Sequence, residues 1–411
     1  MNIFNDKLDK LKVNVNPGEK SIDISRIKAA KFYESNTVDS MGISTVFGQL
    51  FQKMKKYPIK NYLSQPDNRL FVVTLLGEGS TDYGGPYRDV LTTICDELQS
   101  KYLDLFIRTP NHKNDIGLLR DKWIPNPSAK KAVHQDMYFF IGCMLGHAIS
   151  SGHLLSLNLH PLVWNKILSP NTGVFGDFES VDKLFFKYIN EIEKTPAKTE
   201  EEFNELYPEL NFSILLSDES EIELIRGGKT KKVTLSNKAE FVELAKKWRL
   251  SEFNLQVESI RSGLTNVIPE SIISLLMGKE LEELACGKQL LNVTILKQFT
   301  EYQGYSPEDK VIINFWNAIN EFSNDERIAY LKYVWGRSRL PDPNIYKFIH
   351  TIAKTGSSNP DKRLPTATTC YFTLKLPNYS TYEILRDKLR YVIQNCSEID
   401  TDFTVSSNEF D

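Results

Sequence analysis

Apolar residues recur every three to four positions along most of the chain, which predicts a largely helical protein. Helices are predicted at Asp23–Phe32, Val46–Lys56, Tyr87–Lys101, Asp136–Ser150, Leu162–Leu168, Val181–Lys194, Lys238–Leu250, Leu255–Val267, Ile272–Leu276 and Thr381–Cys396. Two further helices are predicted between Pro307 and Val334. Gly152 follows one of these patterns closely and indicates a helix end.

Patterns typical of strands are fewer and shorter. The apolar run Leu70–Leu76 ends at Gly77 and predicts a strand. A meander is predicted from three short segments separated by turn residues, namely Phe212–Leu216, Glu221–Ile225 and Lys232–Leu235. Pro110–Pro127 is rich in turn residues and predicts a loop. The acidic segment Pro196–Pro208 is expected to be exposed.

Composition narrows the classes of function. The 411 residues suffice for two or three domains. The 50 basic and 53 acidic residues nearly cancel, which argues against direct nucleic-acid binding. The longest mostly apolar stretch, Tyr138–Ile149, is too short to span a membrane, and Met1–Lys10 does not resemble a signal peptide. We therefore expect a cytoplasmic or nuclear protein with reduced thiols.

Most chemical motifs fail a test of spacing. The turn Gly77-Glu78-Gly79 lacks the third glycine of a dinucleotide-binding loop, because Asp82 stands at that position. No cysteine is followed six positions later by the arginine of a tyrosine-phosphatase loop. Cys143 and His147 lie one helical turn apart without further ligands, so we expect core residues rather than a metal site, and no cofactor. A cysteine protease stays open as an alternative, although none of the six histidines lies in a recognisable context.

One of the five cysteines has unusual surroundings. Cys370 follows Pro365 and a run of hydroxyl residues, and it precedes the strand-like segment Tyr371–Leu376. A cysteine on such a short loop is expected to be partly exposed, as a nucleophile must be. Cys396, on the last predicted helix, is expected to be structural. The sequence therefore singles out Cys370 as the candidate reactive thiol.

The segment around Cys370 resembles the active-site loop of HECT-type E3 ubiquitin ligases, with Leu364-Pro365 and Thr369-Cys370 at matching positions. Further segments similar to family motifs follow in chain order: Gly77-Glu78-Gly79, Phe140-Ile141-Gly142, Gly227-Gly228, Gly304-Tyr305-Ser306, Phe315-Trp316 and Gly336–Pro341. Pro161-Leu162-Val163-Trp164 looks most like the HERC-type subgroup. The order of these matches identifies the chain as a member of the HECT family.

This resemblance implies an α+β, bilobal fold. A lead-in at 1–42 would precede a mostly helical N-lobe with small β-sheets at 43–286, whose E2-binding subdomain would lie at about 178–250. A smaller α/β C-lobe at 290–411 would carry the catalytic cysteine. Gly287, Lys288 and Gln289 would form the hinge between the lobes, where a glycine gives the backbone freedom.

The resemblance also implies the reaction. Cys370 would accept ubiquitin as a thioester from a ubiquitin-conjugating enzyme (E2) and pass it to a lysine of a protein substrate. Thr369 would help to stabilise the oxyanion, and either Phe403 or Phe410 would aid transfer to lysine. The alternative is a catalytically inactive scaffold that binds E2 or ubiquitin, and the intact Thr369-Cys370 pair argues against it.

Contacts to the E2 are expected on aromatic and aliphatic side chains of the N-lobe subdomain. The resemblance assigns them to Phe241, Leu184, Tyr188 and Ile192; the alternative is that these residues form core. The chain departs from the family at two positions beside the cysteine. Thr368 stands where many members have histidine, which puts that histidine's role in doubt, and Phe372 stands where asparagine is often found.

Overall fold

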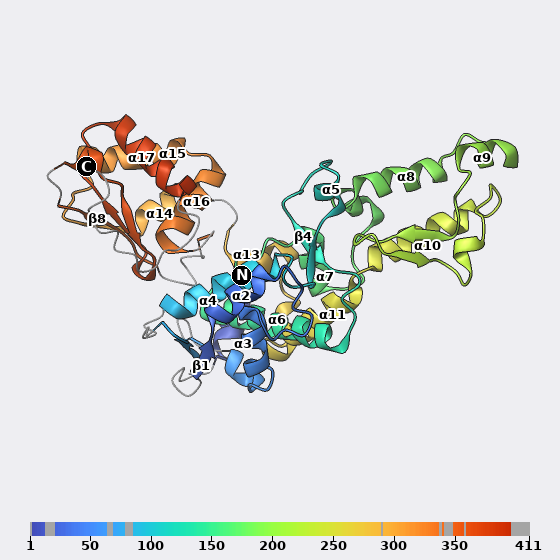
Figure 1. The fold of residues 1–411 in the computed structure, drawn as a ribbon, viewed down its shortest axis with the longest axis horizontal. Coiled ribbons are helices and arrows are strands. Elements are labelled where there is room, and N and C mark those ends of the chain that lie inside the picture. Colours follow the sequence, from blue (N-terminus) through green and yellow to red (C-terminus); the bar gives the residue numbers. More distant parts are fainter. Residues whose placement is uncertain are drawn as a thin grey trace. The chain divides into compact units, whose positions relative to one another are not determined.

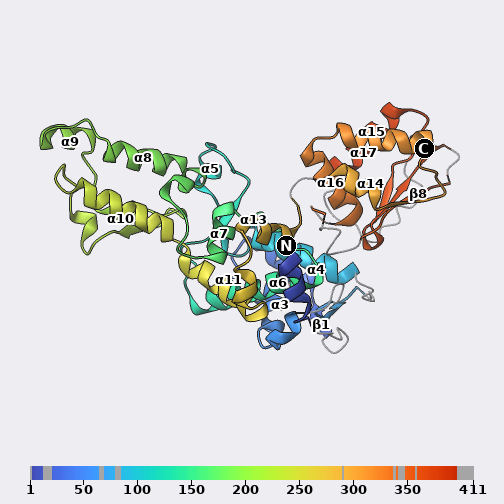
Figure 2. The same cartoon turned by 180° about the vertical axis from the view of Figure 1, so that it is seen from behind.

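The fold is that of a computed structural model, which describes residues 2–12, 21–63, 69–78, 85–288, 291–336, 339–340, 348–356 and 359–395, except the side chains of Asn2, Lys60, Asn61 and Cys370. The chain divides into two compact units. Unit 1 comprises residues 1–81 and 93–285, and unit 2 comprises residues 82–92 and 286–411. Figures 1 and 2 show the elements of both units from opposite sides.

Helices dominate the chain up to residue 286. The α-helices are α1 (Asn2–Asp9), α2 (Arg26–Glu34), α3 (Val46–Met54), α4 (Gly85–Leu98), α5 (Pro110–Lys113), α6 (Ala132–Ser151), α7 (Pro161–Leu168), α8 (Lys183–Glu193), α9 (Glu200–Leu206), α10 (Lys238–Ser251), α11 (Asn254–Val267), α12 (Glu270–Ile273) and α13 (Gly278–Cys286). Short 3-10 helices lie at η2 (Ile59–Tyr62), η3 (Phe175–Ser180) and η4 (Gly228–Thr230).

The core of unit 1 forms around the pair α6 and α11. α6 is apolar on all sides and is buried along most of its length, so its sequence reads as an apolar run. Two glycines let the two backbones approach closely. A Cβ added at Gly142 would lie 2.0 Å from the Ile260 carbonyl oxygen, and one added at Gly263 would lie 1.9 Å from that of Phe139. Gly152 ends α6 at a positive φ of 77°, as predicted.

Three two-stranded sheets accompany these helices. β1 (Ser21–Ile24) pairs in parallel with β2 (Val72–Leu75), whereas β3 (Phe106–Arg108) with β4 (Trp123–Pro125) and β5 (Ser213–Leu215) with β6 (Glu221–Glu223) are antiparallel. Two predictions are wrong here. Residues 21–24 pair as a strand rather than beginning a helix, and the segment Pro110–Pro127 contains α5 and β4.

A separate apolar cluster holds α8, α9, α10 and the β5–β6 pair together, and α8 and α10 run beside each other in Figures 1 and 2. Phe203 of α9 is fully buried in it, so the acidic segment around α9 is exposed on only one side. The predicted meander has two strands rather than three, because Lys232 makes only an isolated bridge to Asn211. This cluster forms the base of the groove described below.

Unit 2 is a mixed sheet with helices. Its elements are α14 (Val293–Gln298), β7 (Thr300–Gln303), α15 (Lys310–Glu321), α16 (Asn324–Trp335), β8 (His350–Lys354), η5 (Pro360–Lys362), β9 (Thr366–Thr368), η6 (Thr369–Tyr371), β10 (Thr373–Leu376) and α17 (Tyr382–Asn395). The strand order is β7-β8-β10-β9, with only the β10–β9 pair antiparallel. Leu374 and Leu376 of β10 are buried in the helical core, and Lys375 between them is exposed.

None of the helices in the described part of the chain is long and apolar enough to cross a membrane. Three cysteines have described side chains, Cys95, Cys143 and Cys286, and all three are buried. Burial raises the pKa of the Cys143 thiol to about 12, so this thiol stays protonated and inert. His147 is also a core residue, since its Nδ1 lies 3.2 Å from the Tyr62 carbonyl oxygen. The prediction of core residues rather than metal ligands is confirmed for this pair.

Candidate active site and partner groove

The turn that carries Cys370 closes a β-hairpin in unit 2. β9 and β10 are paired up to Thr368 and Thr373, so residues 369–372 form a four-residue loop. Its first three residues form η6, and the Phe372 N–H donates to the Thr369 carbonyl oxygen at 3.3 Å. The prediction of a short loop between Pro365 and a strand is confirmed, and the strand begins at Thr373. The Cys370 thiol is outside the described atoms, so the site is defined by this backbone and its neighbours.

Phe372 anchors the last position of the loop. Its backbone is left-handed, with φ 48° and ψ 48°, and its side chain is only 3% exposed. The ring stacks on Trp335 with centroids 4.2 Å apart and planes 4° apart, and it lies 4.8 Å from the ring of His350. By contrast, the neighbouring Tyr371 is 73% exposed. The loop therefore has one aromatic side chain in the core and one in solvent.

Hydrogen bonds also hold the segment that leads into the loop. The Tyr333 hydroxyl donates to the Pro365 carbonyl oxygen at 2.6 Å, and the Tyr379 hydroxyl donates to that of Arg363 at 2.8 Å. Asp361 accepts from the backbone N–H and the hydroxyl of Ser380, which lowers the pKa of its carboxyl. The approach to Cys370 is thus tied to α16 and to the chain beyond β10.

His350 is the one histidine in the sequence of unit 2, and it is structural. It is fully buried, with Nδ1 2.9 Å from the Thr300 hydroxyl and Nε2 2.8 Å from the Tyr330 hydroxyl. Burial lowers the pKa of its imidazole to about 3. Since both ring nitrogens are engaged, His350 is not available as the general base that a papain-like protease needs.

Several predicted residues can be placed only in part. Thr369 is half-buried at the start of the loop, whereas Phe403, Phe410, Cys396 and Gln289 lie outside the described residues. Gly287 has a φ of 83° and follows the end of α13, and its carbonyl oxygen accepts from Arg339 at 3.2 Å. The Lys288 N–H donates to the Leu340 carbonyl oxygen at 3.2 Å.

A groove of about 930 Å³ lies in unit 1 between α8, the segment after α9 and the β5–β6 pair. Four large apolar side chains that line it are between 41% and 55% exposed: Leu184, Tyr188, Leu206 and Leu215. Two of them, Leu184 and Tyr188, were predicted as partner contacts from the sequence. Clustered apolar side chains of this size around a hollow are typical of a protein-binding surface.

The other two predicted contacts are core residues. Phe241 and Ile192 are both 0% exposed. The Phe241 ring packs edge-on against Phe212, with centroids 5.8 Å apart, and forms part of the groove floor. Direct contact of these two side chains with a partner is therefore wrong for the structure as it stands, because the apolar cluster beneath the groove covers them.

A buried guanidinium joins the walls of the groove. Arg249 of α10 is 1% exposed and donates to Asp182 at 2.8 Å, to Glu252 at 3.1 Å and to the Leu215 carbonyl oxygen at 3.1 Å. Ser217 bridges it to Glu252, with its hydroxyl 2.5 Å from that carboxylate. Burial raises the pKa of Glu252, and the charge of Arg249 opposes that rise. The network thus ties the start of α8 to β5.

The Arg249 side chain is also enclosed by rings. Its guanidinium carbon lies 4.2 Å from the centroid of Phe185 and 4.7 Å from that of Phe178. Sequence reasoning missed Arg249, Leu206 and Leu215. The adjacent pair Leu215-Leu216 carries a signal for one of them, because successive strand residues point to opposite faces and only one of two adjacent leucines can be buried.

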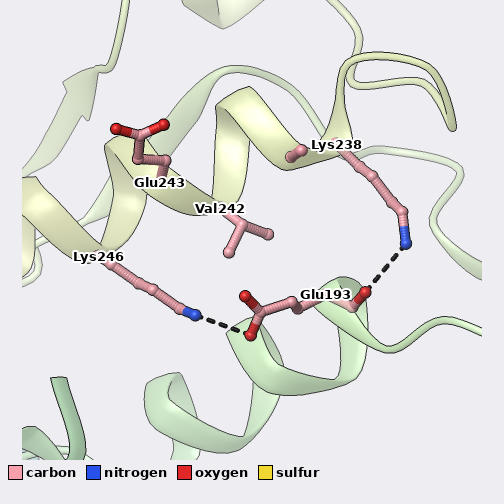
Figure 3. Close-up of a pocket in the computed structure, with 6 residues that line it drawn as sticks. Glu193, Lys238, Val242, Glu243 and Lys246 are labelled. Atoms are coloured by element: carbon pink, nitrogen blue, oxygen red, sulfur yellow. Dashed lines mark hydrogen bonds and ion pairs between the residues drawn. The ribbon is translucent and has the colours of Figure 1, made fainter.

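A smaller hollow of about 290 Å³ lies between α8 and α10. Figure 3 shows two lysines of α10 reaching the last turn of α8. Lys246 pairs with the Glu193 carboxylate at 2.7 Å, and Lys238 donates to the Glu193 carbonyl oxygen at 3.0 Å. A lysine at a helix C-terminus also complements its dipole. These contacts fasten the two helices together, and the hollow has no nucleophile or set of metal ligands.

The search for metal sites over the described residues found no cluster of three or more histidine, cysteine or acidic side chains. The described part of the site thus consists of a pinned turn in unit 2 and an apolar groove in unit 1.

Comparison with known proteins gives a family for this arrangement. The family HECT-domain (ubiquitin-transferase) matches residues 92–402. The human E3 ubiquitin-protein ligase HERC2 is 37% identical over 365 residues, which are 88% of this chain and 7% of that protein. Human E3 ubiquitin-protein ligase NEDD4 is 31% identical over 340 residues, 79% of this chain and 24% of that protein. The probable E3 ubiquitin-protein ligase HECTD4 of human is 28% identical over 79% of this chain and 9% of its own length.

The chain thus spans only a small part of the length of these relatives. The match to the family nevertheless covers most of this chain, including β9, η6 and β10 around Cys370. The resemblance of the active-site loop and of the other motifs is confirmed by this match, together with the likeness to a HERC-type protein. The chain belongs to the HECT-domain (ubiquitin-transferase) family.

Proposed function

We propose that this chain is the catalytic part of an E3 ubiquitin ligase in which Cys370 carries ubiquitin as a thioester. The observation that carries the proposal is the family match over residues 92–402, which contains Cys370 on a hairpin loop pinned to a core. The Cys370 thiolate attacks the thioester carbonyl of E2-bound ubiquitin, and the E2 cysteine leaves as a thiolate. A substrate lysine amine then attacks the new thioester, forms an isopeptide bond and releases the Cys370 thiolate.

Such a reaction needs little acid–base machinery. Exchange between two thiols is nearly balanced in free energy, so catalysis consists mostly of placement. This requirement agrees with the described surroundings of the loop, where the one histidine of unit 2 is locked in a structural role. The Thr369 hydroxyl and the amides of the loop are proposed to stabilise the oxyanion that forms at the attacked carbonyl.

The two units are proposed to be the two lobes of the domain. Unit 1 would be the N-lobe that receives the E2, and unit 2 would be the C-lobe that carries Cys370. The boundary between units, between Ala285 and Cys286, supports a hinge at 287–289. The positive φ of Gly287 also supports it, because a glycine there tolerates rotations that other residues resist.

The groove of unit 1 is proposed to bind the E2. Its exposed Leu184 and Tyr188 would supply the contacts, with Leu206 and Leu215 beside them. Phe241 and Ile192 would act from beneath, by holding α8 and α10 in place. Phe403 is proposed to aid transfer to lysine. A HERC-like set of biological partners and substrates would come with the remainder of a longer protein.

The decisive experiment is a thioester assay. The chain is incubated with E1, a panel of E2 enzymes, ATP and ubiquitin, and it is run on a non-reducing gel. We expect an adduct of one ubiquitin that thiol reagents cleave and that is absent from Cys370→Ala. The absence of any adduct with every E2 tested would overturn the proposal and favour an inactive scaffold.

A further inference from the structure

We propose that Phe372 is a positioning residue for ubiquitin transfer: its stacked ring sets the backbone of the loop that presents Cys370. This inference rests on the proposed function and goes beyond it, because it assigns a task to a side chain that touches no reacting group. Phe372 lies two residues after the cysteine, on the opposite end of the loop from Thr369.

The backbone of Phe372 has a conformation that its residue type disfavours. At φ 48° and ψ 48° it is left-handed, a region that residues with a Cβ avoid and that glycine and asparagine tolerate best. Among the described residues of unit 2, no other non-glycine residue has a positive φ. A bulky residue persists in such a conformation only where its surroundings determine it.

Three sets of contacts determine it here. The ring is stacked 4.2 Å from Trp335, 4.8 Å from His350 and 6.0 Å from Phe348. The Phe372 carbonyl oxygen accepts from the Thr351 N–H of β8 at 3.0 Å, and its own N–H closes the loop onto Thr369. The side chain and both polar backbone atoms are thus engaged at once. Rotation about φ of Phe372 would break at least one of these contacts.

The loop transmits this constraint to Cys370. Both ends of the loop are fixed by the paired residues Thr368 and Thr373, so its four residues have few backbone solutions. The left-handed step at residue 372 selects among them, and it thereby sets where the backbone of Cys370 lies. If the ring were removed, residue 372 could relax to a right-handed or extended conformation and the loop would take several arrangements.

Transfer depends on this placement. The new C–S bond to Cys370 forms as the C–S bond to the E2 cysteine breaks, with no net change of oxidation state and one thiolate exchanged for another. A step so balanced draws its rate from geometry, and a displacement of the nucleophile by about 1 Å costs up to about a hundredfold. Phe372 therefore belongs to the maximum rate of transfer rather than to the binding of the E2.

The test compares Phe372→Leu and Phe372→Asn with the matched control Phe348→Leu. The control removes a ring from the same aromatic cluster, but Phe348 is not part of the loop. Single-turnover transfer from E2~ubiquitin is measured at increasing E2~ubiquitin, below the melting temperature of every variant. We expect both Phe372 variants to be at least about tenfold slower at saturation, with an unchanged half-saturating concentration, and Phe348→Leu to stay within about twofold of wild type.

A second measurement does not depend on activity. Hydrogen exchange in the full chain should accelerate at the amides of Thr351 and Phe372 in Phe372→Leu more than in Phe348→Leu. A normal maximum rate in Phe372→Asn or Phe372→Leu would overturn the proposal, as would an equal loss in Phe348→Leu. If a Phe372 variant does not fold, the other one decides. Wild-type chain that forms no thioester contradicts the proposed function instead, so the two failures can be told apart.

Discussion

The walls of the groove in unit 1 meet over a buried guanidinium, whereas the loop in unit 2 closes over stacked rings. Arg249 satisfies two carboxylates and a backbone carbonyl, each with a definite direction. Phe372 is held by ring contacts with Trp335 and His350 that have no such requirement. The comparison teaches that a charged support is lost abruptly when one partner is removed, because the others are left buried and unpaired, while an aromatic support weakens by degrees.

The largest effect is expected from Arg249→Met. The substitution leaves the carboxylates of Asp182 and Glu252 buried without a cation, which should cost about 3–5 kcal/mol of stability. Lys246→Met is the control, because its pair with Glu193 is partly exposed and is expected to contribute about 1 kcal/mol or less. Urea unfolding of the full chain measures both values. Equal losses in the two variants would remove the distinction between the buried and the exposed pair.

A pH experiment addresses the aromatic side of the comparison. Burial lowers the pKa of His350 to about 3, whereas the unfolded imidazole titrates near 6.5. The unfolded chain therefore gains a proton first as the pH falls, and unit 2 should lose about 1.4 kcal/mol per pH unit below 6.5. Between pH 6.5 and pH 5 this loss amounts to about 2 kcal/mol.

His350→Phe should abolish this slope, although the variant is expected to be less stable at neutral pH because Thr300 and Tyr330 lose their partner. Hydrogen exchange of peptides from β8 and β10, corrected for the intrinsic effect of pH, gives the stability of unit 2. The shifted carboxyl groups in the described part of unit 2, Glu308, Glu326 and Asp361, have lowered pKa values and titrate below this window. An unchanged slope in the variant would show that another group causes it.

A smaller effect should separate the groove surface from its support. Leu184→Asp places a charge on a side chain that is 47% exposed, so stability should barely change. The concentration of E2 needed for half-maximal transfer should rise about tenfold, which corresponds to about 1.4 kcal/mol of binding. Leu255→Asp is a matched control, since Leu255 is 45% exposed and does not line the groove. A loss of the same size in the control would point to charge rather than to the surface.

The smallest effect is expected from Tyr333→Phe. This change removes the hydroxyl that donates to the Pro365 carbonyl oxygen and keeps the ring. A single hydrogen bond contributes about 1 kcal/mol, so the melting temperature should fall slightly and the transfer rate should stay within about twofold. A loss of rate as large as that of Phe372→Leu would mean that polar tethers, rather than rings, hold the loop.

Local pattern predicted most helices, because their apolar positions repeat within one or two turns. Asp136–Ser150 and Lys238–Leu250, for example, correspond closely to α6 and α10. The prediction was wrong where distant segments decide the structure. Residues 21–24 are a strand because they pair with β2, which lies about 50 residues later. No periodicity within the first segment contains that information.

The site shows the same boundary. Leu184, Tyr188 and Ile192 are spaced four apart and lie on one stripe of α8, yet the first two are exposed and the third is 0% exposed. Helical spacing places side chains on one face, but tertiary packing decides how far along the helix that face is covered. The departure at Phe372 was visible in the sequence as well. Its left-handed backbone was not, because phenylalanine gives no local signal for that conformation.

The buried cysteines give this fold a practical property as a chemical reporter. Cys95, Cys143 and Cys286 are at most 3% exposed, so a brief pulse of alkylating reagent should leave all three unlabelled in the folded chain. Any rapid mass increase is then assigned to Cys370 or Cys396 by elimination, without a single mutation. Later increments, counted by intact mass, would time the opening of the segments that hold the three buried thiols. The chain thus carries its own clock for local unfolding alongside its reactive thiol.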